Sequence, residues 1–118
     1  MRLLVVDDDL SVGKLLRAIF ETEGWEVDYA RSGEECLAMV EAGPPDVIVL
    51  DQMMPGLTGI ETARQLRTGG FEKPIVLFSA YVGPDLQTAV NELGLEPVSK
   101  VDTQAVIRIV DRLGGALA

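Results

Sequence analysis

The sequence contains no histidine and only one cysteine, Cys36. Without histidine, the chain has no imidazole for acid–base catalysis and no histidine ligand for a metal. A single cysteine excludes an internal disulfide, which fits a reducing compartment. These absences exclude imidazole-based catalysis and histidine-ligated metal sites.

Basic residues are also scarce, with 10 Lys and Arg against 19 Asp and Glu and a formal net charge of −9. Nucleic-acid binding needs a basic face, so this balance argues against direct contact with DNA or RNA. It fits a protein that handles cations or meets basic partners. No apolar run approaches the length of a membrane span, and acidic residues interrupt the N-terminal run too early for a signal peptide. We therefore expect a cytoplasmic protein that does not contact a membrane.

Apolar residues make up 47% of the 118 residues, which suits one folded domain over residues 1–118. Short apolar runs alternate with segments of helical periodicity. The predicted strands are 2–7, 25–30, 44–51, 73–80 and 95–100, and the predicted helices are 10–24, 32–43, 58–70, 84–94 and 103–115. This strict alternation predicts an α/β fold with a parallel sheet. Right-handed crossovers favour a doubly wound sheet with helices on both faces.

Several local features follow from residue type. Ser32 and Glu35 form a capping-box pattern at the start of the second helix. Asp9 is a candidate N-cap of the first helix. Cys36 lies on the apolar side of its helix and is expected to be buried. Trp25 and Tyr81 are expected to be partly buried aromatic side chains.

Polar side chains lie at the ends of four of the five predicted strands. They are Asp7, Asp8 and Asp9 at the end of the first strand, Asp51 at the end of the third, Ser79 at the end of the fourth and Lys100 at the end of the fifth. The carboxyl ends of parallel strands share one edge of the sheet, where ligands bind in doubly wound folds. Carboxylates that converge there favour a hard cation such as Mg²⁺, which offsets their mutual repulsion.

The same residue types suit phosphoryl chemistry. Asp51 could act as a carboxylate nucleophile and form an acyl phosphate. Ser79 could donate a hydrogen bond to one phosphoryl oxygen, and Lys100 could place a positive charge beside another. A strand-end aspartate is often only a turn residue, but several strand ends with matching chemistry favour a functional site.

The stretches LLVVDDD, VIVLDQMMPGLTGIE, PIVLFSA and SK together resemble the receiver domain of bacterial two-component response regulators. The resemblance runs over essentially the whole chain. It implies a flavodoxin-like fold, with a five-stranded parallel sheet in the order 2-1-3-4-5 and five helices. It also implies that an aspartate at the end of the third strand accepts a phosphoryl group from a histidine kinase, with Mg²⁺.

Carried over position by position, the resemblance makes Asp51 the phosphoryl acceptor. Asp7 and Asp8 become the acidic pair of the metal site, with Asp8 the more direct ligand. The backbone carbonyl of Met53 becomes a further ligand of Mg²⁺ or Mn²⁺. Ser79 and Lys100 become the hydroxyl and the ammonium group that contact the phosphoryl group.

The resemblance also implies partners and a type of activity. The phosphoryl donor is a histidine kinase or a phosphotransfer protein, and the output goes to a downstream protein or a fused output domain. The chain is then a signalling domain that supports only its own phosphorylation and dephosphorylation, and not an enzyme acting on a substrate.

Three other functions are alternatives to a phosphoryl-accepting receiver. A haloacid-dehalogenase-like phosphatase needs a second acid two residues after its aspartate, where this chain has Met53. A flavodoxin-like electron carrier needs a glycine- and hydroxyl-rich phosphate loop where this chain has DDDLS. A receiver-like interaction module with phosphorylation-independent output is the closest alternative.

Two departures from the family pattern keep that third alternative open. Val101 stands where the family usually has proline, and Pro97 stands where it usually has Tyr or Phe. The lysine–proline bond of receivers is often cis, whereas a cis bond before a residue other than proline costs about 2.5–4 kcal/mol. We therefore expect a trans bond between Lys100 and Val101, and an altered output switch.

Overall fold

The structure is a computed structural model that describes residues 1–117. Strands and helices alternate along the chain as the sequence predicts. The strands are β1 (Arg2–Val6), β2 (Glu26–Ala30), β3 (Val47–Asp51), β4 (Ile75–Ser79) and β5 (Glu96–Ser99). The helices are α1 (Leu10–Thr22), α2 (Gly33–Ala42), α3 (Gly59–Thr68), α4 (Pro84–Leu93) and α5 (Thr103–Leu117).

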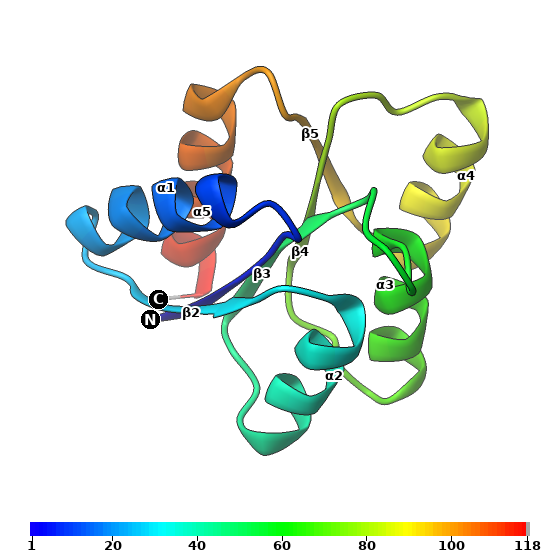
Figure 1. Cartoon of the computed structure of the whole chain (residues 1–118), viewed down its shortest axis with the longest axis horizontal. Coiled ribbons are helices and arrows are strands. Elements are labelled where there is room, and N and C mark those ends of the chain that lie inside the picture. Colours follow the sequence, from blue (N-terminus) through cyan, green and yellow to red (C-terminus); the bar gives the residue numbers. More distant parts are fainter. Residues whose placement is uncertain (118) are drawn as a thin grey trace.

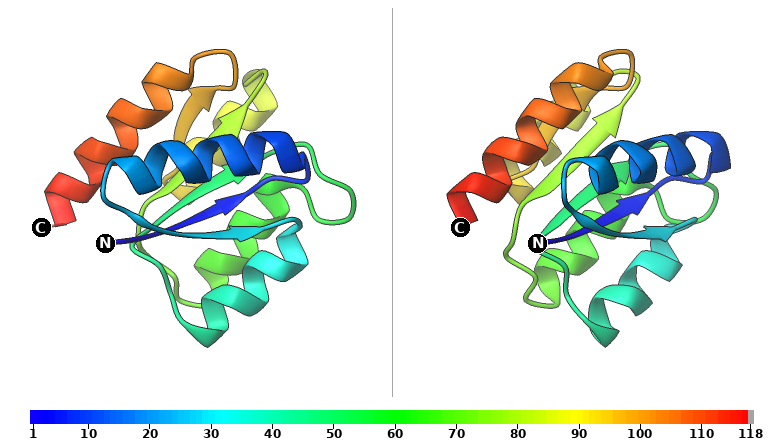
Figure 2. Two further views of the ribbon diagram at one scale, coloured as in Figure 1. Left: turned by 60° about the vertical axis from the view of Figure 1, so that its left-hand side comes forward. Right: turned by 90° about the vertical axis from the view of Figure 1, so that its left-hand side faces the viewer.

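The five strands form one parallel sheet in the order β2-β1-β3-β4-β5, which confirms the predicted topology (Figure 1). Helices α1 and α5 cover one face of the sheet, and α2, α3 and α4 cover the other (Figures 1 and 2). The chain reverses its direction of winding between β1 and β3, because β1 pairs with both β2 and β3. This junction is the switch point where doubly wound sheets bind ligands.

The core has two apolar layers, one on each face of the sheet. Strands β3 and β4 are buried along their whole length, and β1 is buried after its first residue. Leu3, Val5 and Val49 point toward α1 and α5, whereas Leu4 and Leu50 point toward α2, α3 and α4. Parallel strands covered on both faces need this continuous apolar character.

Three helices begin at residues whose side chains cap them. The Oδ1 atom of Asp9 accepts a hydrogen bond from the amide of Ser11 at 2.9 Å, which confirms the predicted N-cap of α1. At α2, the hydroxyl of Ser32 accepts from the amide of Glu35 at 3.1 Å, which is one half of the predicted capping box. A capping box with both halves occurs instead at α3, between Thr58 and Glu61.

Each strand is shorter than predicted, and β5 ends before Lys100. Pro97 lies in β5 at the edge of the sheet, opposite Leu77 of β4, and its side chain is exposed. An edge strand tolerates proline because one side of it forms no strand pair. The bond between Lys100 and Val101 is trans, as expected, and residues 1–117 contain no cis peptide bond.

The structure also bears on three single residues. Cys36 is fully buried, and its burial raises the pKa of the thiol to about 12. Trp25 is half-buried as expected. The expectation for Tyr81 was wrong, because its side chain is 74% exposed on the loop between β4 and α4. None of the helices in residues 1–117 combines the length and the apolar character needed to cross a membrane.

Candidate functional site

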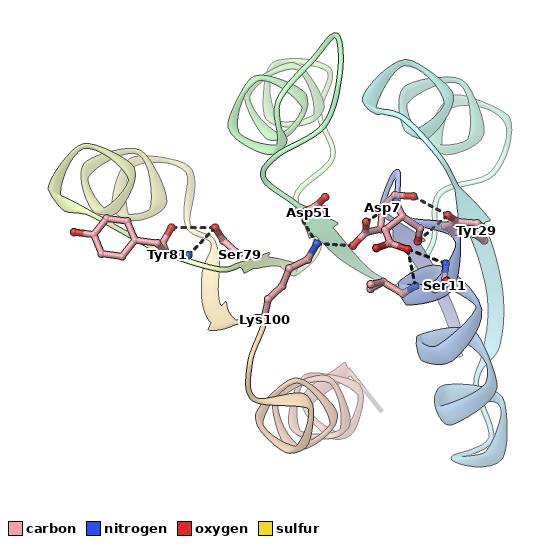
Figure 3. Close-up of polar contacts among 9 residues, drawn as sticks. Asp7, Ser11, Tyr29, Asp51, Ser79, Tyr81 and Lys100 are labelled. Carbon is pink, nitrogen blue, oxygen red and sulfur yellow. Dashed lines mark hydrogen bonds and ion pairs between the residues drawn. The ribbon is translucent and has the colours of Figure 1, made fainter.

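Four of the predicted site residues lie around the carboxyl edge of the sheet. Asp51 and Ser79 are the last residues of β3 and β4, and Asp7 and Lys100 directly follow β1 and β5. Figure 3 shows Asp7, Asp51 and Lys100 pointing toward one another across this edge. The parallel order of the strands produces this convergence, because each strand delivers its last side chains to the same edge.

Lys100 bridges the two buried carboxylates. Its Nζ atom lies 3.0 Å from Oδ2 of Asp7 and 3.0 Å from Oδ1 of Asp51. Asp7 is 1% exposed and Asp51 is 3% exposed, so both acids have lost most of their contact with water. The amide of Lys100 donates to the carbonyl of Ser79 at 2.9 Å and holds the lysine backbone beside β4.

Burial and the local charges shift the pKa values of this group. Burial raises the pKa of Asp51 to about 6, and the charge of Asp7 adds to this effect, whereas Lys100 and the amide of Met53 oppose it. Burial disfavours the charge of Lys100, but its contacts with Asp7 and Asp51 outweigh that cost and raise the pKa of Lys100. One lysine therefore does not fully compensate two buried acids, and the site favours additional positive charge.

The oxygen atoms of the site fit a small cation. Carboxylate oxygens of Asp7, Asp8 and Asp51 lie within 4.8 Å of one another. The Oδ2 atom of Asp51 is buried and has no hydrogen-bond partner among the residues that the structure describes, so one acceptor of this side chain is left to a ligand. Asp8 is exposed and approaches the group from the solvent side. An all-oxygen set of this kind suits Mg²⁺ or Mn²⁺.

The hydroxyl of Ser79 lies at the same edge of the sheet as the acids, at the end of β4, but points toward Tyr81 (Figure 3). It donates a hydrogen bond to the carbonyl oxygen of Tyr81 at 3.0 Å (Figure 3). Met53 lies on the loop after Asp51 with its side chain 73% exposed. The structure thus brings Asp7, Asp8, Asp51 and Lys100 together, and places Ser79 beside them in a different hydrogen bond.

Two residues near the site were missed by sequence reasoning. The hydroxyl of Tyr29 in β2 donates to the carbonyl oxygen of Asp7 at 2.7 Å. Burial and the charges of Asp7, Asp8 and Asp9 raise the pKa of Tyr29, while Arg31 opposes them, so the hydroxyl keeps its proton at neutral pH.

The second missed residue is Gln52, whose Oε1 atom accepts from the amide of Ile60 at 2.8 Å and ties the start of α3 to the residue after Asp51. Neither contact has a signal in the sequence, because each joins residues that only the folded chain places together.

The chain resembles solved structures over nearly its whole length. A Francisella response regulator receiver domain superposes with a TM-score of 0.91 at 28% identity, covering 99% of this chain and 98% of that one. The response regulator TrrA of Thermotoga maritima, solved in complex with Mg²⁺–BeF, superposes with a TM-score of 0.84 at 31% identity, covering 95% and 97% of the two chains.

Sequence comparison identifies longer relatives. The response regulator MprA of Mycobacterium avium is 46% identical over 80 residues, which is 68% of this chain and 35% of MprA. The chain thus aligns with about a third of the length of these relatives.

Residues 3–108 match the family described as the response regulator receiver domain. This match includes every predicted site residue from Asp7 to Lys100, and it agrees with the strand order and the acidic cluster. The chain belongs to the response regulator receiver domain family of two-component signalling.

Proposed function

We propose that Asp51 accepts a phosphoryl group from a phosphohistidine on a histidine kinase or a phosphotransfer protein. The observation that carries the proposal is the buried, unpartnered Oδ2 atom of Asp51 at the end of β3, beside the ammonium group of Lys100. Residues 1–118 contain no histidine, so the phosphohistidine must lie outside these residues.

The transfer needs a nucleophile and compensation for negative charge. A carboxylate oxygen of Asp51 attacks the phosphorus atom, and the phosphorus–nitrogen bond to the donor imidazole breaks. The electron pair of that bond leaves with the imidazole nitrogen, which takes up a proton. Lys100 places positive charge beside the new acyl phosphate, and Ser79 can exchange its bond to the Tyr81 carbonyl for one to a phosphoryl oxygen.

Asp8, Asp51 and the backbone carbonyl of Met53 would hold Mg²⁺ or Mn²⁺, with Asp7 as the acidic neighbour. The bound cation would reduce the repulsion between the incoming phosphoryl group and the carboxylates. The fit rests on the clustered carboxylate oxygens and on the unpartnered atom of Asp51.

Membership of the family supports a proposal for the wider role. We propose that residues 1–118 form a single receiver domain in the cytoplasm, which supports only its own phosphorylation and dephosphorylation. Phosphorylation would change its contacts with a downstream protein or a fused output domain. The net charge of −9 argues against direct nucleic-acid contact by this domain.

A receiver-like interaction module with phosphorylation-independent output is the second candidate. Pro97 favours it, because it lies exposed on β5 where the family usually has an aromatic residue. Such a module would keep the fold and bind its partner without an acyl phosphate.

The deciding experiment is incubation with acetyl phosphate, with and without Mg²⁺, followed by intact-mass spectrometry. The wild type should gain one phosphoryl group only with Mg²⁺. Asp51→Asn should gain none, while Asp111→Asn, which changes an exposed residue of α5, should behave as the wild type. An adduct on Asp51→Asn would move the acceptor elsewhere, and an unmodified wild type would favour the interaction module.

Metal binding gives a separate test. Millimolar Mg²⁺ should raise the melting temperature of the wild type, because a ligand that binds only the folded state stabilises it. Asp8→Ala should remove most of this gain while keeping the fold, since Asp8 is exposed. A wild type whose melting temperature ignores Mg²⁺ and Mn²⁺ would contradict the metal assignment.

A further inference from the structure

The loop that carries the acidic residues is held by the neighbouring edge strand. The amide of Asp7 donates to the carbonyl of Ala30 at 3.1 Å, and the carbonyl of Asp7 accepts from the hydroxyl of Tyr29 at 2.7 Å. Both backbone groups of Asp7 are therefore bonded to the end of β2. The hydroxyl of Tyr29 also lies 3.5 Å from the carbonyl of Asp9.

A glycine in α1 makes room for the tyrosine ring. A Cβ atom added at Gly13 would lie 2.3 Å from two ring carbons of Tyr29, closer than atoms of this kind approach in proteins. The ring thus packs directly on the backbone of α1. In this position its hydroxyl reaches the loop between β1 and α1. Only a residue without a side chain permits this approach.

Further hydrogen bonds run from this anchor to the charged site. The amide of Asp9 donates to Oδ1 of Asp7 at 2.9 Å, and Asp9 in turn caps α1. The other oxygen of Asp7 faces Lys100 at 3.0 Å. A shift of the Asp7 peptide would therefore move its carboxylate and change the spacing of the acidic oxygens.

We propose that Tyr29 is a positioning residue for the metal-binding acids, acting through the backbone carbonyl of Asp7. The proposal rests on the function proposed above, because it assumes that these acids hold a divalent cation. In this role Tyr29 would contact neither the cation nor the phosphoryl group, because its hydroxyl is bonded to the backbone of Asp7. Its hydroxyl sets the peptide from which Asp7 and Asp8 extend.

The test measures the affinity for Mn²⁺ by the electron paramagnetic resonance signal of the free ion. Tyr29→Phe removes one oxygen atom and keeps the ring on Gly13. We expect its Mn²⁺ affinity to fall roughly tenfold, as for other residues that orient metal ligands. Tyr81→Phe removes the hydroxyl of an exposed tyrosine and should bind Mn²⁺ as tightly as the wild type.

A second variant breaks the same hydrogen bond without changing Tyr29. Gly13→Ala should displace the ring and weaken Mn²⁺ binding to a similar extent, although alanine favours the helix. The double variant should bind no more weakly than Gly13→Ala alone, because both changes remove one interaction. Gly13→Ala alone still tests the role of the Tyr29 hydrogen bond if Tyr29→Phe fails to fold.

The outcomes separate the two proposals. If the wild type binds Mn²⁺ and both single variants bind it equally well, Tyr29 has only a structural role and the inference is wrong. If the variants melt at a lower temperature but bind Mn²⁺ as tightly as the wild type, Tyr29 again has only a structural role. If the wild type itself binds no Mn²⁺, the metal site fails and the inference fails with it.

Discussion

At the scale of single residues, the site holds two buried carboxylates against one lysine. Asp7 and Asp51 each lie 3.0 Å from the Nζ atom of Lys100. The pKa of Asp51 is nevertheless raised to about 6, because the effects of burial and of Asp7 exceed the attraction of Lys100. The ionised form of Asp51 is thus a local source of instability, which a bound cation would relieve.

Removing this charge should stabilise the metal-free protein. In metal-free buffer at neutral pH, Asp51→Asn should increase the free energy of unfolding by up to about 3 kcal/mol. Between pH 3.8 and about 6 the folded protein holds a proton on Asp51 that the unfolded chain has released, so wild-type stability falls as the pH rises. Below this window both states are protonated, and the advantage of the variant should vanish.

Urea denaturation at several pH values would measure this difference. Asp111→Asn is the matched control, because it neutralises an exposed carboxylate and should give no gain at neutral pH. A variant Asp51→Asn that is less stable than the wild type in metal-free buffer would show that the bond to Lys100 outweighs burial.

At the scale of elements, one arginine joins three segments at the end of the sheet opposite the site. Arg67 lies in the last turn of α3. Its guanidinium donates to backbone carbonyls of two other segments. The acceptors are Leu93 at 2.9 Å, Phe71 at 2.9 Å, Lys73 at 2.7 Å and Gly94 at 3.3 Å. These bonds tie α3 to the segment entering β4 and to the turn between α4 and β5.

Arg67→Ala should destabilise the fold by about 2–3 kcal/mol, because it leaves partly buried carbonyls without a donor. Arg64→Ala is the control on the same helix, since Arg64 forms an exposed pair with Glu92 at 3.0 Å. An exposed pair contributes about 0–1 kcal/mol. Chemical denaturation would compare the free energies of unfolding of the two variants. Equal losses would mean that water replaces Arg67 as the hydrogen-bond donor to these carbonyls.

At the scale of the whole molecule, the surface formed by α4, β5 and α5 lacks two features that receiver domains usually have there. Pro97 is exposed on β5 and offers no aromatic ring that could move inward when Ser79 changes partner. Val101 is 88% exposed and follows a trans bond, so the loop after Lys100 has no proline constraint. We infer that a change at Ser79 passes less readily to this surface.

Amide hydrogen exchange with and without a beryllofluoride phosphoryl mimic should therefore show a muted response over residues 95–110. The largest changes should occur in the loops at 54–58 and 80–84, which adjoin Asp51 and Ser79. Pro97→Tyr should enlarge the response over 95–110, because tyrosine suits a strand and restores a ring. Changes over 95–110 in the wild type as large as those beside Asp51 would contradict this view.

Much of this protein could be predicted because its pattern is local and repetitive. Alternating apolar runs and helical periods imply a parallel α/β sheet, and a parallel sheet brings the ends of its strands to one edge. Asp7, Asp51, Ser79 and Lys100 could therefore be predicted to share one edge from their places at the ends of four strands. The N-cap role of Asp9 was equally local, since it involves residues two and three positions away.

Other features depend on contacts between distant residues and on side-chain direction, which only the tertiary structure decides. Tyr29 meets Asp7 because β2 pairs with β1, and its ring fits because Gly13 faces it. The hydroxyl of Ser79 donates to the carbonyl of Tyr81, and the rotamer that makes this contact has no signal in the sequence. The sequence by itself determined that the polar residues at the strand ends share one edge of the sheet, since the ends of parallel strands must converge. The tertiary structure decided which atoms touch, since rotamers and long-range packing have no local signature.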